Sequence, residues 1–341
     1  MAIGADKLPI NHLTVSIIIP VHNGGRAFIR CLKALLYSRT QPDEIIVVAN
    51  GCRDRSAEIA RLSGAQVIDL SQAVGPAAAR NAAAGKARGD LLFFVDADVA
   101  LHPESLGTVR ALFQVHPELS ACFGSYDDNP PEKNFFSQYK NLFHHFMHQQ
   151  GQPQATTFWA GCGAVRRTVF AELGGFDESY RQPAIEDIEL GYRLIARGFK
   201  IRLEKRLQAT HLKRWGLASL LKADFLGRAL PWSRLILRSS FVPSDLNTKR
   251  RYRFSALLVA LFVILLFVSL TGAIPLWPAT VTIGLLTVLN LDWYLFVFNK
   301  KGWSWTIPAV IWHWVYYLYS TIAFLIALGE HFTPTKVQQN Q

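Results

Sequence analysis

The chain has 341 residues, of which 50% are hydrophobic and 12% aromatic, and a formal net charge of +11. This length accommodates one large domain plus an appendage, and a positive mean hydropathy of +0.16 is unusual for a soluble domain, so a membrane-attached protein is favoured. The excess of basic residues indicates anionic partners, namely nucleotide phosphates, nucleic acid or lipid headgroups.

The 4 cysteines are widely scattered and show no CxxC spacing. This pattern argues against a zinc site and against a disulfide framework, and it favours reduced cytosolic thiols. Residues 1–13 lack the basic and then apolar pattern of a signal peptide, and we predict an N-terminal tail there.

Apolar runs alternate with helical patterns in the N-terminal part of the chain. Strands are predicted at residues 15–21, 44–49 and 66–70, and helices at 28–36, from about 54, and at 76–88. Because strand and helix alternate with short connections, we predict a parallel α/β sheet. A nucleotide-binding fold of about 200 residues therefore begins at the N-terminus.

The run Leu91–Val95 has no polar face and predicts a strand that is buried on both sides of the sheet. It is followed by two carboxylates one residue apart, Asp96 and Asp98. Ligands of open α/β sheets collect at the carboxyl ends of strands, and an Asp-x-Asp pair there can hold a hard divalent cation that bridges nucleotide phosphates. The alternative is a surface turn with two solvated acids.

The regular alternation weakens after Asp98. Helices are predicted at 103–116, 135–149 and 167–173, and strands at 119–126 and 158–165. His144, His145 and His148 resemble a metal cluster, but no glutamate accompanies them in an HExxH arrangement. We therefore interpret them as a polar stripe that faces solvent or an interface.

A second acidic pair, Glu186 and Asp187, opens the predicted helix 186–194. These carboxylates either complement the helix dipole, which is worth roughly 0.3–1 kcal/mol, or perform chemistry. A carboxylate brought opposite the turn at Asp96 and Asp98 is suitably placed to remove a proton from an incoming hydroxyl.

Basic residues dominate from residue 200 to residue 253, with Trp and Leu interleaved at helical spacing, as at Trp215, Leu220 and Trp232. This composition predicts basic amphipathic helices in a membrane interface over 212–253. Nucleic-acid binding is the rival interpretation, and the apolar segment that follows argues against it.

No charged residue occurs from Phe254 to Leu291. Since a hydrocarbon core of ~30 Å takes about 20 helical residues, we predict two spans there and a third near the C-terminus, which gives three transmembrane helices over 254–328. Basic clusters at 249–253 and 300–301 mark the cytoplasmic side. Both clusters lie on the same side of the membrane only if there are three spans. The N-terminal domain is then cytoplasmic, and the tail, 329–341, lies on the far side. Asp292 is either interfacial or functional.

Five segments together resemble, in order and spacing, the motifs of glycosyltransferase family 2. They are residues 15–23, 44–54, 75–98, 161–177 and 186–194. The resemblance implies a membrane-anchored bacterial-type member with an α/β GT-A fold over 14–211. This is a Rossmann-like nucleotide-binding domain with a mostly parallel central sheet, followed by interfacial and transmembrane helices.

The resemblance also implies site residues and a cofactor, Mg²⁺ or Mn²⁺. Asp187 matches the general base of the Glu-Asp motif, with Glu186 beside it. Asp96 (nearer the ribose), Asp98 and His211 match the metal site. The residues assigned to the nucleotide sugar are Pro20, His22, Asn23, Asn50, Arg80 and Asp96. Where the family commonly has Asp-Asp-Gly-Ser, this chain has Ala-Asn-Gly-Cys at 49–52, so the base that is recognised stays open.

The expected function is inverting transfer of a sugar from a nucleotide-diphosphate sugar to a membrane lipid or lipid-linked acceptor at the cytoplasmic face of the inner membrane. The acceptor is a polyprenyl phosphate or a glycolipid hydroxyl, and the hydroxyl suits a general base better. The alternatives are a processive polysaccharide synthase, a non-catalytic sugar-nucleotide-binding scaffold, and a transporter with a regulatory domain. Arg214-Trp215 resembles the end of the synthases' Gln-x-x-Arg-Trp motif, but the Gln is missing, and we interpret the pair as interfacial.

Overall fold

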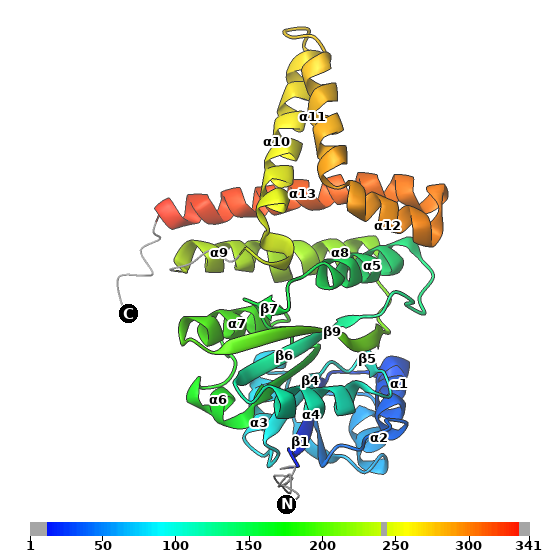
Figure 1. Ribbon diagram of the computed structural model, residues 1–341, viewed down its shortest axis with the longest axis vertical. Coiled ribbons are helices and arrows are strands. Elements are labelled where there is room, and N and C mark those ends of the chain that lie inside the picture. Colours follow the sequence, from blue (N-terminus) through cyan, green and yellow to red (C-terminus); the bar gives the residue numbers. More distant parts are fainter. Residues whose placement is uncertain (1–11, 240–243, 334–341) are drawn as a thin grey trace, which may run out of the picture.

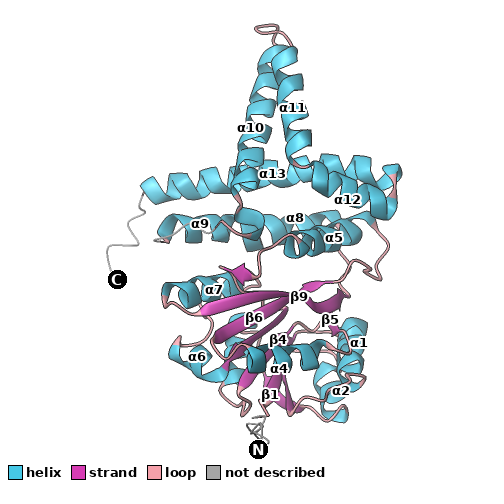
Figure 2. Cartoon of the chain, viewed as in Figure 1, coloured by secondary structure: helices cyan, strands magenta, loops and turns pink. Residues whose placement is uncertain are grey.

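The computed structural model describes residues 12–239 and 244–333. An α/β domain forms one end of the molecule, a layer of helices lies across it, and a helical hairpin projects from that layer (Figure 1). The strands of the described residues all belong to the α/β domain, and the remainder is helical (Figure 2).

The strands form a single mixed sheet with the order β3-β2-β1-β4-β8-β6-β9-β5, and β7 pairs with β9 beside this path. The strands are β1 (Val15–Val21), β2 (Glu44–Asn50), β3 (Gln66–Leu70), β4 (Leu91–Val95), β5 (Val99–Leu101), β6 (Leu119–Tyr126), β7 (Gln154–Ala155), β8 (Cys162–Arg166) and β9 (Lys200–His211). The predicted parallel arrangement is confirmed for β1 to β4. The other half differs, because β8 runs antiparallel to β4 and β6, and β5 runs antiparallel to β9.

Helices cover both faces of the sheet. They are α1 (Gly25–Leu36), α2 (Ser56–Leu62), α3 (Pro76–Ala84), α4 (Ser105–Val115), α6 (Arg167–Glu172) and α7 (Glu186–Ala196). Alternate residues of β1 show the division: Ile17 packs in the core beneath α1, α2 and α4, and Ile18 packs in the core beneath α3, α6 and α7. Since side chains of a strand point to opposite faces in turn, strands covered on both faces are apolar: β4 is apolar throughout, and β1 is apolar except for Ser16, whose hydroxyl donates to Glu44.

The sequence patterns did not reveal β9, which lies in the segment that we interpreted by its basic residues. Its burial alternates along the strand, with Ile201, Leu203, Leu207 and Ala209 inside and the Lys and Arg residues mostly outside. The period of two is present, but the charges that occupy the outer positions hide it. The predicted strand 158–165 is also shorter than expected, because only β8, from Cys162, enters the sheet.

A second layer of helices lies over the α/β domain (Figure 1). It contains α5 (Phe135–Gln149), α8 (Leu217–Asp224), the π-helical turn η1 (Phe225–Ala229), α9 (Leu230–Arg238) and the short turn η2 (Leu246–Thr248). The predicted helices within 212–253 therefore exist, and part of their apolar side chains lie against protein, although Leu217 and Leu226 are exposed. Trp232 of α9 is buried beside α7, where its indole N–H donates to the Tyr192 hydroxyl at 2.9 Å.

The remaining helices are α10 (Arg250–Leu270), α11 (Trp277–Leu289), α12 (Leu291–Lys301) and α13 (Trp303–Phe332). By length and composition α10 and α13 are able to cross a membrane, and α11 with α12 counts as a third span only if a 66° bend is accepted. Figure 1 shows α10 and α11 side by side as the projecting hairpin, with α13 running across its base. Asp292 forms an ion pair with Arg251 at 2.7 Å, which joins α12 to the start of α10.

Candidate active site

A cleft of about 830 Å³ opens at the carboxyl ends of β1, β2 and β4 and faces the start of α7. All side chains that the sequence assigned to the site lie along it. They are Pro20, His22, Asn23, Asn50, Arg80, Asp96, Asp98, Glu186, Asp187 and His211. The fold therefore brings motifs from distant parts of the chain into one site, at the edge where open α/β sheets bind ligands.

The side chain of Asn50, at the end of β2, forms hydrogen bonds within the cleft wall. Its amide donates to the Gly75 carbonyl at 3.3 Å, and its side-chain oxygen accepts from the Val74 N–H at 2.8 Å. The imidazole Nδ1 of His22 lies 2.7 Å from the Asn50 carbonyl oxygen. These bonds tie the ends of β1 and β2 to the loop before α3, so Asn50 shapes the cleft and does not present a free amide.

Arg80 connects the two acidic motifs. Its guanidinium donates to Asp96 at 2.7 Å and to Glu186 at 2.8 Å, and only 6% of the Arg80 side chain is exposed. The second oxygen of Glu186 accepts from the Ala184 N–H at 3.0 Å. The neighbouring carboxylates raise the pKa of Arg80 against the opposing effect of its burial. Glu186 is thus occupied by protein donors, and it fixes the start of α7 relative to the turn after β4.

Asp98 and His211 are neighbours because β5 pairs antiparallel with β9, which sets His211 opposite Val99. Burial lowers the pKa of His211 to about 3, so its ring is neutral and stacks on Tyr126 at 4.2 Å. Burial raises the pKa of Asp98, although Lys213 lies 3.8 Å away and opposes this shift.

The metal assigned from the sequence has suitable donors here, although they do not form a complete ligand set. Among the described residues, no three His, Cys, Asp or Glu side chains stand close enough together to hold a metal ion. One oxygen of Asp96 is held by Arg80, whereas Asp98 and the neutral His211 face the cleft. Carboxylate oxygens are the ligands that Mg²⁺ and Mn²⁺ prefer, so the donor types fit these ions.

Asp187 lies at the far wall of the cleft, in the first turn of α7. Its Oδ2 accepts from the Ala160 N–H at 3.0 Å and its Oδ1 from the Ile188 N–H at 2.8 Å. Burial raises the pKa of Asp187 to about 6, and the adjacent Glu186 carboxylate adds to this effect. A carboxylate with a pKa near the working pH is able to accept a proton and release it again.

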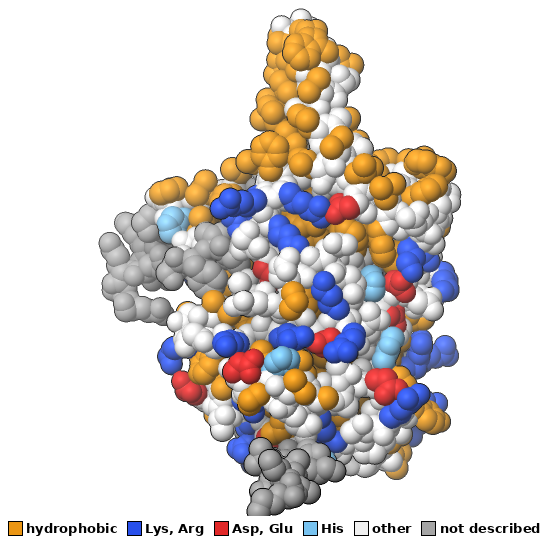
Figure 3. Space-filling view, in the orientation of Figure 1, with side chains coloured by type: hydrophobic (Ala, Val, Ile, Leu, Met, Phe, Trp, Pro, Cys, Tyr) orange, Lys and Arg blue, Asp and Glu red, His pale blue; other side chains and the backbone are white. Residues whose placement is uncertain are grey.

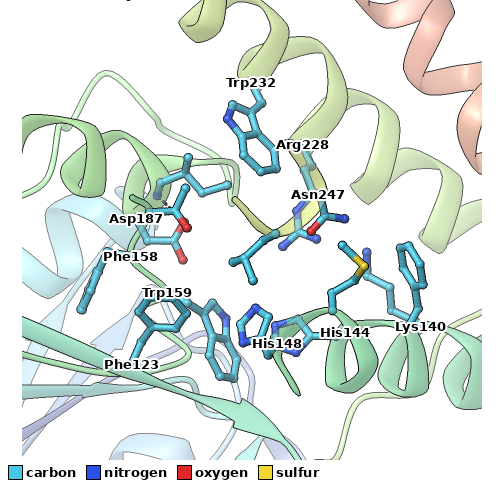
Figure 4. A pocket seen from close by; sticks show the side chains of 15 residues that line it. Phe123, Lys140, His144, His148, Phe158, Trp159, Asp187, Arg228, Trp232 and Asn247 are labelled. Atoms are coloured by element: carbon cyan, nitrogen blue, oxygen red, sulfur yellow. Dashed lines mark hydrogen bonds between the residues drawn. The ribbon is translucent and has the colours of Figure 1, made fainter. Parts of the chain in front are cut away.

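A second, smaller cavity of about 40 Å³ lies between α5, α7 and η1 and adjoins the cleft, with which it shares Lys140, His144, Trp159, Asp187 and Arg228. Figure 4 shows Asp187 and Arg228 at its wall, with Lys140, His144 and His148 below them. Burial lowers the pKa of His148 to about 4 and holds the pKa of His144 well below its usual value, so both rings are neutral. The predicted polar stripe on α5 thus faces β6 and this cavity, where the His148 Nδ1 lies 2.8 Å from the Gly124 carbonyl oxygen.

The sequence patterns missed Arg228 as a site residue and placed it only among the basic residues of the interfacial segment. It lies in η1, which precedes Pro231 near the start of α9. Proline has no N–H to bond the carbonyl four residues earlier, that of Gly227, and the helix adopts a π turn at this point. The Gly227 Cα also approaches Pro183, since a Cβ there would meet the Pro183 carbonyl oxygen at 3.1 Å. The sequence signal for this site was Gly227 and Arg228, which stand a few residues before Pro231.

Comparison with known proteins agrees with this geometry. The family model described as Glycosyl transferase family 2 matches residues 16–174. The chain is 26% identical over 239 residues to a validoxylamine A glucosyltransferase of Streptomyces hygroscopicus subsp. limoneus, covering 58% of this chain and 52% of the relative. It is 27% identical over 234 residues to a pre-mycofactocin glycosyltransferase of Mycobacterium tuberculosis, covering 65% and 48%. The chain spans about half the length of these curated relatives.

Among solved structures, the fold resembles that of the mannosyltransferase PcManGT from Pyrobaculum calidifontis, solved in complex with GDP-Man and Mn²⁺. The TM-score is 0.63 at 17% identity, and the match covers 92% of this chain and 87% of the other. At this identity the likeness shows the fold alone.

Proposed function

The chain belongs to glycosyltransferase family 2, and on that premise we propose that it transfers a sugar from a nucleotide-diphosphate sugar to a phosphate-bearing membrane lipid. One observation carries the proposal. Asp187 and Arg228 both line the large cleft at the strand ends and the small cavity beside it. In an inverting transfer the acceptor oxygen attacks the anomeric carbon on the face opposite the departing diphosphate, and a proton-accepting group stands beside that oxygen, which is the role we assign to Asp187.

The donor belongs in the cleft. Nucleotides bind at the carboxyl ends of strands in open α/β sheets, and the ends of β1, β2 and β4 line this cleft. A protein of the same fold, PcManGT, was solved with GDP-Man and Mn²⁺. We assign the nucleotide to the wall formed by Pro20, His22 and Asn50, with Asp96 nearer the ribose.

The divalent cation belongs at Asp98 and His211, with Asp96 at the edge of that site. When bound there, Mg²⁺ or Mn²⁺ supplies positive charge that stabilises the departing diphosphate. The chain itself contributes Lys213, which lies beside Asp98. Arg80 keeps the Asp96 carboxylate in one orientation, so that little reorganisation is needed when the donor binds.

Asp187 acts as the proton acceptor for the acceptor group. The two backbone N–H donors at Ala160 and Ile188 orient its carboxylate, and each oxygen keeps a lone pair for the incoming proton. With the pKa raised to about 6, the carboxylate is ionised at neutral pH and still basic enough to share a proton in the transition state. Glu186 contributes by holding α7 in place through Arg80.

The small cavity suits an anionic acceptor group. Arg228 makes no hydrogen bond or ion pair within the described residues, and it lies beside Lys140, whose own partner is Asp224. The negative charge nearest to Arg228 in this cavity is that of Asp187, which interacts with it electrostatically, and the two neutral histidines opposite add none. An arginine fork that is not hydrogen-bonded to a carboxylate, in a partly desolvated site, is suited to a phosphate group. The phosphate is either the nucleophile itself or the link between a sugar hydroxyl and the lipid.

The test is transfer to lipid. The protein, reconstituted in membranes, is incubated with radiolabelled nucleotide sugars and with one of three acceptors: a polyprenyl phosphate, a lipid diphosphate that carries a sugar, or a neutral glycolipid. We expect labelled lipid with one of the two phosphate-bearing acceptors, and which of them reacts identifies the nucleophile. Transfer only to the neutral glycolipid contradicts the phosphate assignment, and donor binding without any transfer contradicts the enzyme assignment.

A further inference from the structure

The helix α13 is long and apolar enough to cross a membrane, yet it touches the catalytic side of the molecule along its length. Near its start, the Trp305 ring stacks on Phe135 of α5 with 5.8 Å between centroids. Farther along, the Tyr319 hydroxyl donates to Asp224 of α8 at 2.9 Å. At its end, Glu330 accepts two hydrogen bonds from the Arg234 guanidinium, each of 2.7 Å.

These contacts fix the direction of the helix. Trp305 and Glu330 are separated by about 38 Å at a rise of 1.5 Å per residue. A helix crossing the ~30 Å hydrocarbon core would place one of these residues on the far side of the bilayer. However, Glu330 is bonded to α9, and α9 is fixed to α7 of the α/β domain by the bond between Trp232 and Tyr192. Both ends of α13 therefore lie at one level above the catalytic domain, as Figure 1 shows.

The side of α13 that faces away from the catalytic domain is apolar. Its exposed large side chains are Trp303, Ile307, Ile311, Ile322, Leu325 and Phe332, which recur mainly at helical spacing. Other sides of the helix carry buried and hydrogen-bonded groups: the Tyr319 hydroxyl donates to Asp224 of α8, and the Tyr317 hydroxyl donates to Asn290 at the end of α11. Lysines and arginines gather below the apolar hairpin in Figure 3. The end of α12 carries Lys300, and the start of α10 carries Arg251. Cations beside an apolar surface complement anionic lipid headgroups.

The hairpin of α10 and α11 is the part that leaves this layer. Its outer half exposes Ile264, Phe267 and Leu270, and no charged residue occurs between Phe254 and Leu291. The 13 residues of α11 extend only about 20 Å at 1.5 Å per residue. Both ends of this hairpin therefore lie on the side of the catalytic domain.

We propose that α12 and α13 lie flat in the membrane interface, with the exposed apolar face of α13 against lipid, and that the α10–α11 hairpin alone enters the hydrocarbon core. The end of α13 is then on the same side of the membrane as the catalytic domain. This arrangement replaces the three spans expected from hydropathy and basic clusters. It also places the cavity at Arg228 directly beneath the lipid surface, because Asn247 of that cavity donates to the Tyr316 hydroxyl of α13 at 3.0 Å.

Depth measurements test the proposal. Single cysteines replace Trp303, Ile311 or Ile322 in the full chain with Cys52→Ser, since the other native cysteines are buried. Each is labelled with an environment-sensitive fluorophore, and the protein is placed in vesicles whose lipids carry a nitroxide quencher near the headgroup or deep in the acyl chain. The matched control is Phe267→Cys in the hairpin.

We expect shallow quenching to exceed deep quenching at all three α13 positions and the reverse at Phe267→Cys. A tag after residue 341 should be cleaved by protease on the vesicle face that displays the catalytic domain. Deep quenching at Ile311→Cys and Ile322→Cys, or a tag protected inside, would overturn the proposal in favour of a spanning helix. No quenching by either lipid would also overturn it, because the face would then be covered by a second copy of the chain.

Discussion

The cleft and the cavity that meet at Asp187 are built differently. On the cleft side the charges are already paired within the protein, with Arg80 between Asp96 and Glu186. Where the cavity adjoins the cleft, Arg228 makes no hydrogen bond or ion pair in the described part of the chain, although Asp187 interacts with it electrostatically. Internal pairing makes a rigid wall that needs little reorganisation, whereas an unpaired cation favours a ligand that brings its own negative charge. If the proposed function is right, donor and acceptor recognition should be separable by mutation.

The largest effect is expected on the cleft side, at the metal. The change Asp98→Asn removes a carboxylate from the proposed cation site and should abolish nearly all divalent-dependent transfer while the fold is kept. Sugar transfer is measured against Mg²⁺ and Mn²⁺ concentration, with the exposed Asp69→Asn as control. Unchanged turnover in Asp98→Asn, or full wild-type activity in EDTA, would show that the cleft works without this metal.

The next effect is at Asp187, where cleft and cavity meet. The change Asp187→Asn should lower kcat by roughly 10²–10⁴, because the amide cannot accept the proton, while donor Kd stays close to that of the wild type. The control is Glu189→Gln in the same first turn of α7, which alters the helix-dipole charge without touching the cleft. If both variants lose only a few-fold, Asp187 merely complements the dipole.

Breaking the ion pairs of Arg80 in the cleft wall should lower the stability of the fold. Replacing Arg80 with methionine leaves the buried Glu186 and the partly exposed Asp96 without their cation, and it should lower the free energy of unfolding by roughly 3–5 kcal/mol. Denaturant titration of the detergent-solubilised protein measures this loss. Arg80→Lys should recover part of it, since lysine keeps the charge but cannot bridge both carboxylates. A loss of less than about 1 kcal/mol in Arg80→Met would mean that the wall is not held by this pairing.

A smaller effect is expected from pH. Since the pKa of Asp187 is raised to about 6, kcat should fall about tenfold per pH unit below that value as the base becomes protonated. The folded-state pKa lies above the unfolded value of 3.8, so the ionised group disfavours folding and stability should decrease as pH rises between the two values. Asp187→Asn should therefore be at least as stable as the wild type at pH 7. A kcat that is flat from pH 5 to pH 8 would contradict the assignment of the base.

The sequence predicted the cleft better than the cavity for a physical reason. The strand Leu91–Val95 and the acids after it are recognisable locally, because a strand buried on both faces must be apolar throughout. The position of His211, by contrast, depends on the pairing of β5 with β9, and β9 was hidden by the charges on its outer side. Arg228 depends on a π turn and on packing against Pro183, which no local pattern specifies.

The same limit applies to the C-terminal helices. Hydropathy predicts that α13 is apolar enough to enter a membrane, but it does not distinguish a helix that crosses a bilayer from one that lies along it. The direction of α13 is set by single contacts with distant elements, such as Glu330 with Arg234 and Tyr319 with Asp224. Such contacts between residues far apart in sequence are properties of the folded chain.

The most direct measurement of the central claim compares phosphate-bearing and neutral acceptors in wild type and Arg228→Gln, with Arg238→Gln on the exposed side of α9 as control. Loss of a hydrogen-bonded charge typically costs about 1.5–3 kcal/mol, or roughly 10- to 100-fold. We predict that Arg228→Gln raises the KM for the phosphate-bearing acceptor by this factor, removes the preference over the neutral acceptor, and leaves donor Kd unchanged. An unchanged acceptor preference, or a loss that falls on donor Kd instead, would contradict the claim that Arg228 recognises the acceptor and that the wall at the strand ends binds the donor.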